Sequence, residues 1–261
     1  MADTKHRIVR ALLGLALGAQ LTACATTNPA TTAENERKAR SHYEVALNHL
    51  KEGRAAVAIG ELQQADELQP NDPWIQLSLA EAYRLKSHNA EAEKYLLRAL
   101  ELRPDFHAAK LNLSAIYIGL GRYDEAVQLS EELLGDATFP IPWKALTNKG
   151  YAYYKLGKHA EARAALENAL EYHERFWPAI LDLAILEEDT GQRLEALEGY
   201  EKVLSLKPGP IAEAEAHYRI ATIYISLGNR SKAMHHLSVA SETRPSGVWG
   251  KRSADYLKRL R

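Results

Sequence analysis

Residues 107–126 read HAAKLNLSAIYIGLGRYDEA, and residues 143–162 read WKALTNKGYAYYKLGKHAEA. Both stretches hold a small residue, an aromatic residue three positions later, a glycine four positions after that, and then an alanine. These positions are Ser114, Tyr117, Gly121 and Ala126 in the first stretch and Gly150, Tyr153, Gly157 and Ala162 in the second. Because glycine accepts the positive φ of a tight turn, each stretch predicts a helix, a turn and the start of a second helix.

The same pattern recurs six times along the chain. The alanine of the second helix falls at Ala58, Ala92, Ala126, Ala162, Ala196 and Ala233. A period of about 34 residues is that of the tetratricopeptide repeat, whereas a generic helical bundle predicts no fixed period. The predicted repeats span about 39–72, 73–106, 107–140, 143–176, 177–210 and 214–247. The sequence therefore predicts an all-α, right-handed superhelical solenoid of six repeats over residues 39–247.

Residue types within the repeat have mechanical reasons. Small side chains let the two helices of a pair approach closely, and proline ends the second helix in four repeats. Two extra residues separate the third repeat from the fourth, within 136–142, and three extra residues separate the fifth repeat from the sixth. Residues 248–261 predict a capping helix that covers the exposed solenoid end. Its apolar face carries Trp249, Tyr256, Leu257 and Leu260, opposite Lys251, Arg252, Lys258 and Arg259.

The first residues have the form of a targeting signal. Three cationic residues within 5–10 precede the apolar run ALLGLALGAQL at 11–21, which is too short to span a bilayer. The run ends in LTAC at 21–24, which resembles the lipobox of bacterial lipoproteins; an ordinary signal peptide is the alternative. This resemblance implies cleavage between Ala23 and Cys24, lipidation of Cys24 and, with Ala25 next, an outer-membrane location. We expect a signal peptide over 1–23 and a flexible tether over 24–38.

Composition and motifs exclude several classes of function. The 261 residues include 33 Lys+Arg and 34 Asp+Glu, so a nucleic-acid binder that neutralises phosphates is not expected. A single cysteine cannot form an intramolecular disulfide. No nucleotide-binding, hydrolase or metalloprotease motif occurs, and His235 and His236 read as a solvated pair rather than metal ligands. Glu187, Glu188 and Asp189 read as a charged helix end. The chain is expected to be no enzyme, to need no cofactor or metal, and to take no small-molecule substrate.

The first helices of such a solenoid line a concave groove. The groove is expected to bind a peptide segment through apolar, amide and aromatic side chains, although the aromatic ones could instead pack between repeats. The residues expected to contact the partner are Trp74, Leu111, Asn112, Ile118, Lys144, Asn148, Tyr151 and Tyr154. Equivalent repeat positions hold Leu77, Glu81, Arg84, Ala115, Thr147, Leu181, Asp182, Ile185 and Glu188. A carboxylate clamp of the chaperone-binding type is excluded, because Leu77 and Glu81 stand where it needs lysine and asparagine.

Lipobox, tether, six repeats and cap together resemble the pilotin lipoproteins of type IV pilus systems, the PilF, PilW and Tgl-like proteins. The more specific part is LGDATFPIPWKALTNKGYAYYKLG at 134–157, where an aromatic-proline segment leads into an Asn-x-Gly helix. The resemblance implies an outer-membrane lipoprotein that helps a secretin subunit reach the membrane and form its multimer. The alternatives are a periplasmic adaptor that recruits peptidoglycan enzymes or envelope assembly factors, and the regulatory subunit of an enzyme.

Overall fold

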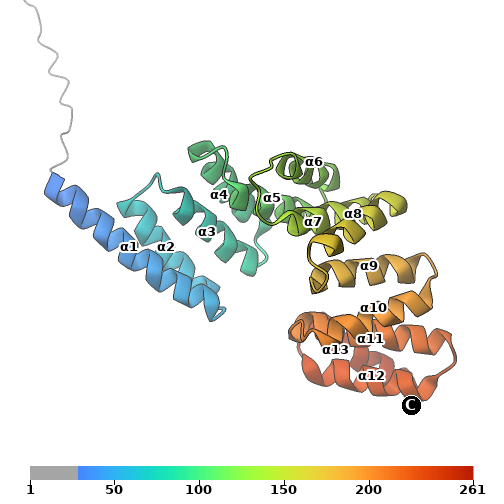
Figure 1. Cartoon of the computed structure of the whole chain (residues 1–261). Coiled ribbons are helices and arrows are strands. Elements are labelled where there is room, and N and C mark those ends of the chain that lie inside the picture. Colours follow the sequence, from blue (N-terminus) through green and yellow to red (C-terminus); the bar gives the residue numbers. More distant parts are fainter. Residues whose placement is uncertain (1–28, 261) are drawn as a thin grey trace, which may run out of the picture.

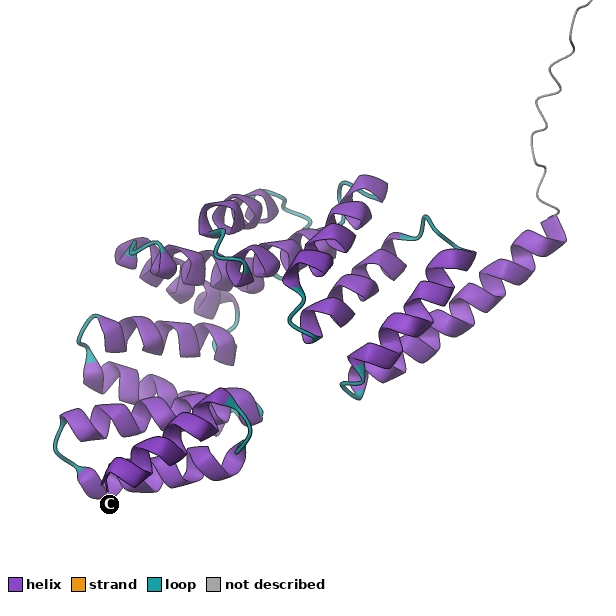
Figure 2. Ribbon diagram, turned by 180° about the vertical axis from the view of Figure 1, so that it is seen from behind, coloured by secondary structure: helices purple, strands orange, loops and turns teal. Residues whose placement is uncertain are grey.

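The computed structural model describes residues 29–260, with side chains from residue 31 onward. Within this range, all regular elements are helices (Figures 1 and 2). Their bounds are α1 Pro29–Lys51, α2 Ala55–Leu68, α3 Pro73–Leu85, α4 Asn89–Leu102, α5 His107–Gly119, α6 Tyr123–Leu134, α7 Pro142–Lys155, α8 His159–Tyr172, α9 Trp177–Asp189, α10 Arg193–Ser205, α11 Pro210–Ser226, α12 Arg230–Thr243 and α13 Val248–Leu260. The expected signal peptide and Cys24 lie outside the described residues.

The helices stack as successive pairs in chain order, from α1/α2 at one end to α11/α12 at the other (Figure 1). In the described range, the main contacts of each helix are with its neighbours along the chain and, for α1, α3, α5 and α7, with the first helix of the next pair. This arrangement is the predicted all-α solenoid. Helix α13 packs on α12 and α11, as a cap does. Its apolar residues Trp249 and Leu257 are half-buried, and its cationic residues are exposed.

The core of each pair is built on the small residues that the sequence alignment singled out. The six alanines that recur in the second helices of the repeats have no exposed surface; they are Ala58, Ala92, Ala126, Ala162, Ala196 and Ala233. The small residues of the first helices are buried as well, and Gly150 leaves no room for a side chain: a Cβ there would lie 2.7 Å from Leu166 Cγ. Close approach of the two helix backbones therefore fixes these positions, which confirms the packing prediction.

Left-handed backbone marks the turn inside each pair. Gly121 has φ of 76°, and the glycines at the same position in four other repeats are also positive. The second repeat has Ser87 instead, with φ of 61°. An L-residue in this region is strained, so the geometry of the pair is strong enough to impose the turn without glycine.

The two expansions of the repeat are accommodated differently. After α6, an irregular segment over 135–141 carries Asp136, whose carboxylate accepts hydrogen bonds from the Thr138 backbone N–H at 2.8 Å and hydroxyl at 2.7 Å. These bonds, with one donated by His107 Nε2, hold the pKa of Asp136 well below its usual range. After α10, by contrast, the extra residues become helical, since α11 begins at Pro210 rather than at the expected residue 214.

The start of α1 corrects the expected tether. Helix α1 begins at Pro29, so residues 29–38 are helical where the composition predicted a flexible segment over 24–38. Side chains 31–38 are nevertheless exposed, and Ala39 is the first buried residue. Burial of side chains thus begins at residue 39, and the helix extends ahead of that point. The polar Thr/Ala/Asn composition indicated solvent exposure correctly and backbone conformation wrongly.

Candidate partner-binding groove

The first helices of successive pairs lie closer to one another than the second helices do. Substantial contacts join α1 to α3, α3 to α5, α5 to α7 and α7 to α9. In the described range, the second helices of successive pairs make no comparable contacts with one another. The array therefore curves toward its first helices, which form the inner surface. This is the surface on which the sequence placed a partner groove.

A pocket of about 210 Å³ lies on this surface between α5, α7 and the start of α9. Four of the predicted contact residues line it together: Leu111, Asn112, Lys144 and Asn148. Ala115 and Thr147, at equivalent repeat positions, line it as well. The structure thus brings half of the predicted contact set into one concave, partly apolar pocket with two side-chain amides and one cation.

Two lining residues, Phe176 and Pro178, are absent from the predicted set. Both could have been found by extending the repeat frame. Pro178 stands at the position that Trp74 and Lys144 occupy in their repeats. Phe176 closes its repeat as Phe106 does, and the Phe106 ring packs edge-to-face on Trp74 at 4.6 Å.

Asn148 is tied to the neighbouring repeat. Its Nδ2 donates to the Leu111 carbonyl and to Ser114 Oγ, each at 3.4 Å. Ser114 is itself fully buried, and its hydroxyl contacts Ser130 Oγ at 3.0 Å. The Asn148 Nδ2 group therefore links α7 to α5. Asn148 thus stabilises the packing of neighbouring repeats and also lines the pocket.

Tyr151 and Tyr154 lie farther along α7. Their rings are 6.0 Å apart, with the Lys155 ammonium within 6 Å of both. The Tyr154 hydroxyl donates to Asp189 of the next repeat, and its ring packs against the core around α9. Tyr154 therefore packs between repeats, which is the alternative that the sequence left open. Tyr151 is half-buried, and burial raises the pKa of its hydroxyl.

Trp74 and Ile118 lie apart from this pocket. Trp74, at the start of α3, is 48% exposed, and Ile118 packs against a core cluster with residues from α3 to α7. Neither lines the pocket between α5 and α7. On the inner surface, Trp74 and Ile118 can therefore serve only as outlying contacts.

The C-terminal half of the inner surface carries a charged network. Glu188 accepts hydrogen bonds from Tyr200 at 2.6 Å and from Arg219 at 3.0 Å, which leaves this carboxylate engaged inside the protein. Asp182 lies nearby, and burial together with the negative charge of Glu215 raises its pKa to about 8, although Arg219 opposes the shift. This part of the surface is therefore less anionic at neutral pH than its carboxylates suggest.

The histidines correct one interpretation. His236 is not a solvated partner of His235, because its Nδ1 lies 2.8 Å from Nδ1 of His217 on α11. Burial lowers the pKa of His236 to about 4. Glu187, expected at a charged helix end, is instead buried and paired with Arg163 at 3.2 Å. Among the described residues, no group of three or more His, Cys, Asp or Glu is placed to hold a metal ion.

Comparison with known proteins agrees with this architecture. Models of the tetratricopeptide repeat match residues 84–149, 143–176 and 214–242. The chain contains tetratricopeptide repeats. Within the described range, no helix of this repeat protein is long and apolar enough to cross a membrane.

Its relatives in sequence differ greatly in length. The chain is 27% identical to type IV pilus assembly protein PilF of Pseudomonas aeruginosa over 184 residues, covering 68% of this chain and 72% of PilF. It is 33% identical over 129 residues to Superkiller complex protein 3 of Mus musculus, which is 49% of this chain but only 8% of that protein. The match to PilF is thus between proteins of similar extent, whereas the other match is confined to a short part of a long chain.

Solved structures show the same fold. The crystal structure of PilW, described as a widely conserved type IV pilus biogenesis factor, has a TM-score of 0.69 at 24% identity and covers 82% of this chain and 97% of PilW. The structure of Pseudomonas aeruginosa PilF has a TM-score of 0.64 at 17% identity and covers 85% of this chain and 99% of that chain. The crystal structure of the APC/C hetero-tetramer Cut9-Hcn1 has a TM-score of 0.73 at 17% identity, but the match covers only 45% of that chain.

Proposed function

We propose that this protein is an outer-membrane lipoprotein pilotin, which binds a secretin subunit and promotes its membrane localisation and multimer assembly for type IV pilus biogenesis. The observation that carries the proposal is the sequence relation to PilF, because it extends over 68% of this chain and 72% of a type IV pilus assembly protein. The lipobox-like residues 21–24 and the pocket on the inner surface also support it. Tetratricopeptide solenoids bind proteins through such concave surfaces.

A deletion strain tests the role in secretin assembly. Without the protein, we expect heat-resistant secretin multimers to disappear from gels and secretin monomer to accumulate, with recovery when the gene is restored. Normal multimers in the deletion strain would contradict the proposal. A defect confined to cell-wall remodelling would instead favour the periplasmic adaptor.

Lipid anchoring is tested separately. Cys24→Ser is expected to leave the protein unprocessed and without acyl chains, because the cysteine sulfur is the lipid acceptor in lipoproteins. A palmitate analogue should label the original protein in outer-membrane fractions but not the variant. Label that persists in Cys24→Ser would show that the attachment site lies elsewhere. Two or three acyl chains are needed for stable anchoring, so any variant protein that is cleaved without being lipidated should be released from the membrane.

The groove is tested by binding to purified secretin fragments. Tyr151→Ala is expected to cost about 2 kcal/mol of binding free energy if the ring anchors the partner, and Asn112→Ala about 0.5–1.5 kcal/mol. Tyr172→Ala is the matched control, because Tyr172 is 65% exposed on a second helix. Circular dichroism checks that each variant is folded. If Tyr151→Ala and Tyr172→Ala bind equally well, the binding site is not this groove.

A further inference from the structure

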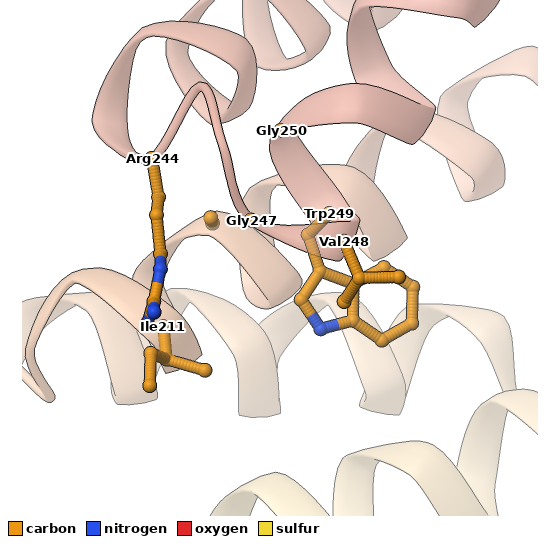
Figure 3. A pocket seen from close by; sticks show the side chains of 7 residues that line it. Ile211, Arg244, Gly247, Val248, Trp249 and Gly250 are labelled. Carbon is orange, nitrogen blue, oxygen red and sulfur yellow. The ribbon is translucent and has the colours of Figure 1, made fainter. Parts of the chain in front are cut away.

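A second pocket, of about 220 Å³, lies at the C-terminal end of the solenoid, away from the central groove. It is formed by the start of α11, the turn between α12 and α13, and the first turn of α13 (Figure 3). The lining residues are Ile211, Ala214, Arg244, Gly247, Val248, Trp249 and Gly250. Figure 3 shows Arg244 and Ile211 on one side of the pocket and Val248 and Trp249 on the other.

The walls of this terminal pocket are apolar and open to solvent. Ile211 is 58% exposed and Val248 is 56% exposed, although both are large aliphatic residues. The Trp249 ring lies 5.2 Å from that of Tyr218, which holds the indole in place. Exposed aliphatic side chains around a tryptophan are typical of a surface that another molecule covers.

The pocket is preformed by close backbone packing. A Cβ on Gly250 would lie 2.1 Å from the Arg244 carbonyl oxygen, so the turn is pressed directly onto α13. A Cβ on Gly247 would lie 2.9 Å from Arg244 Cδ, which shows that the arginine stem runs along this glycine. The position of Arg244 beside the apolar walls is therefore set by the turn itself.

Positive charge surrounds the terminal pocket. Arg244 forms no ion pair within the part of the chain that the structure describes, and it is exposed. The Arg252 guanidinium lies 5.0 Å from the Trp249 ring centre. The Arg219 guanidinium lies 5.5 Å from the same ring, but it is paired with Glu188 and Glu215 and adds little free charge. The turn and α13, residues 244–260, contain five Lys+Arg and one Asp, although the whole chain is nearly neutral. A ligand that matches both features is apolar at its centre and anionic at its flanks.

We propose that the terminal pocket is a second docking site, which takes one aliphatic side chain of an acidic peptide segment from a partner protein. The side chain enters between Ile211, Val248 and Trp249, and flanking carboxylates pair with Arg244 and the cationic face of α13. A peptide is favoured over a lipid because the volume is below the range of small-molecule pockets and fits a single side chain. The site is independent of the central groove and of the proposed pilus function.

Fluorescence anisotropy with the purified full chain tests this site. The probes are three labelled twelve-residue peptides: a central leucine flanked by glutamates, the same leucine flanked by lysines, and a central serine flanked by glutamates. The acidic leucine peptide is expected to bind at least tenfold more tightly than either of the others. Its affinity should fall as salt increases, because exposed charges are screened.

Variants link the binding to the pocket. Arg244→Ala and Ile211→Asp are each expected to weaken the acidic leucine peptide at least fivefold, whereas Arg230→Ala, at the start of α12, leaves binding unchanged. Circular dichroism verifies folding. Equal affinity for the acidic and lysine-flanked peptides, or the same loss in Arg230→Ala and Arg244→Ala, would overturn the proposal. Binding of anionic phospholipid vesicles that depends on Arg244, together with no binding of the acidic leucine peptide, would also overturn the proposal.

Discussion

At the scale of single residues, Asn112 and Asn148 show how one repeat position can have two roles. Both line the central pocket, but only Asn148 donates its amide across the repeat boundary, to Leu111 and Ser114. Asn148→Ala is therefore expected to lower the free energy of unfolding by about 1 kcal/mol, because two long inter-repeat hydrogen bonds are lost. Asn112→Ala, the matched control, should stay within about 0.5 kcal/mol of the original protein. Denaturant unfolding measures both, and equal effects would contradict this distinction.

Asp182 gives a prediction of pH dependence. Its pKa is raised to about 8 in the folded protein, mainly by burial, from an ordinary value near 4. Between these two pH values the folded state holds a proton on Asp182 that the unfolded state releases. The contribution of this group to the free energy of unfolding is therefore fully present below about pH 4 and is lost as the pH rises toward 8. Asp182→Asn mimics the protonated form. We expect it to stabilise the protein by about 1–2 kcal/mol at pH 8 and to have little effect at pH 4.

Thermal unfolding across this pH range measures the effect of Asp182→Asn. Asp124→Asn is a suitable comparison, because Asp124 is an exposed carboxylate on another helix, α6. A difference between Asp182→Asn and the original protein that does not change with pH would show that the carboxyl group is ionised at neutral pH.

At the scale of elements, the α7/α8 pair depends on the absence of a side chain at Gly150. A Cβ there would lie 2.7 Å from Leu166 Cγ and 3.3 Å from the Ala162 carbonyl oxygen, so Gly150→Ala should force the helices apart and cost about 1–3 kcal/mol. Gly60 lies in α2, and a Cβ there would meet nothing within 4 Å. Gly60→Ala should therefore stabilise the protein by about 0.5–1 kcal/mol through helix propensity.

Urea unfolding of the two alanine variants, at equal protein concentration, gives the comparison. Opposite signs are expected for Gly150→Ala and Gly60→Ala. If Gly150→Ala were also stabilising, the pair could not be packed as closely as its small residues indicate. Ala162→Leu tests the same crossing from the second helix and should likewise cost about 1–3 kcal/mol, because Ala162 has no exposed surface.

The elements also show what the sequence could and could not predict. Helix pairing, turn positions and buried alanines follow from local constraints that repeat with a fixed period, so one sequence was sufficient. The engagement of Glu188 by Tyr200 and Arg219 depends on how neighbouring pairs are offset, which the repeat frame alone does not contain. The pocket was found in part for the same reason: the frame identified Asn112 and Lys144, but Trp74 shares the Lys144 position and lies elsewhere.

At the scale of the whole molecule, each helix pair contacts only adjacent pairs, so stability should be distributed along the solenoid. Deleting residues 248–261 removes α13 and exposes the surfaces of α11 and α12 that it covers. Hydrogen exchange is expected to accelerate strongly in α11 and α12, weakly in α9 and α10, and not in α1 to α6. Exchange that accelerates equally in every helix would show that the solenoid unfolds as one cooperative unit instead.

The exposed start of α1 has a geometric consequence for anything that holds the N-terminal side of the chain. Residues 29–38 are helical, and at about 1.5 Å per residue they set a stand-off of roughly 15 Å ahead of Ala39, the first buried residue. A helix cannot be compressed or folded back as a coil can. If acyl chains on Cys24 hold the protein at a bilayer, as proposed, this rod adds up to roughly 15 Å to the distance at which the first repeat can stand from the lipid headgroups.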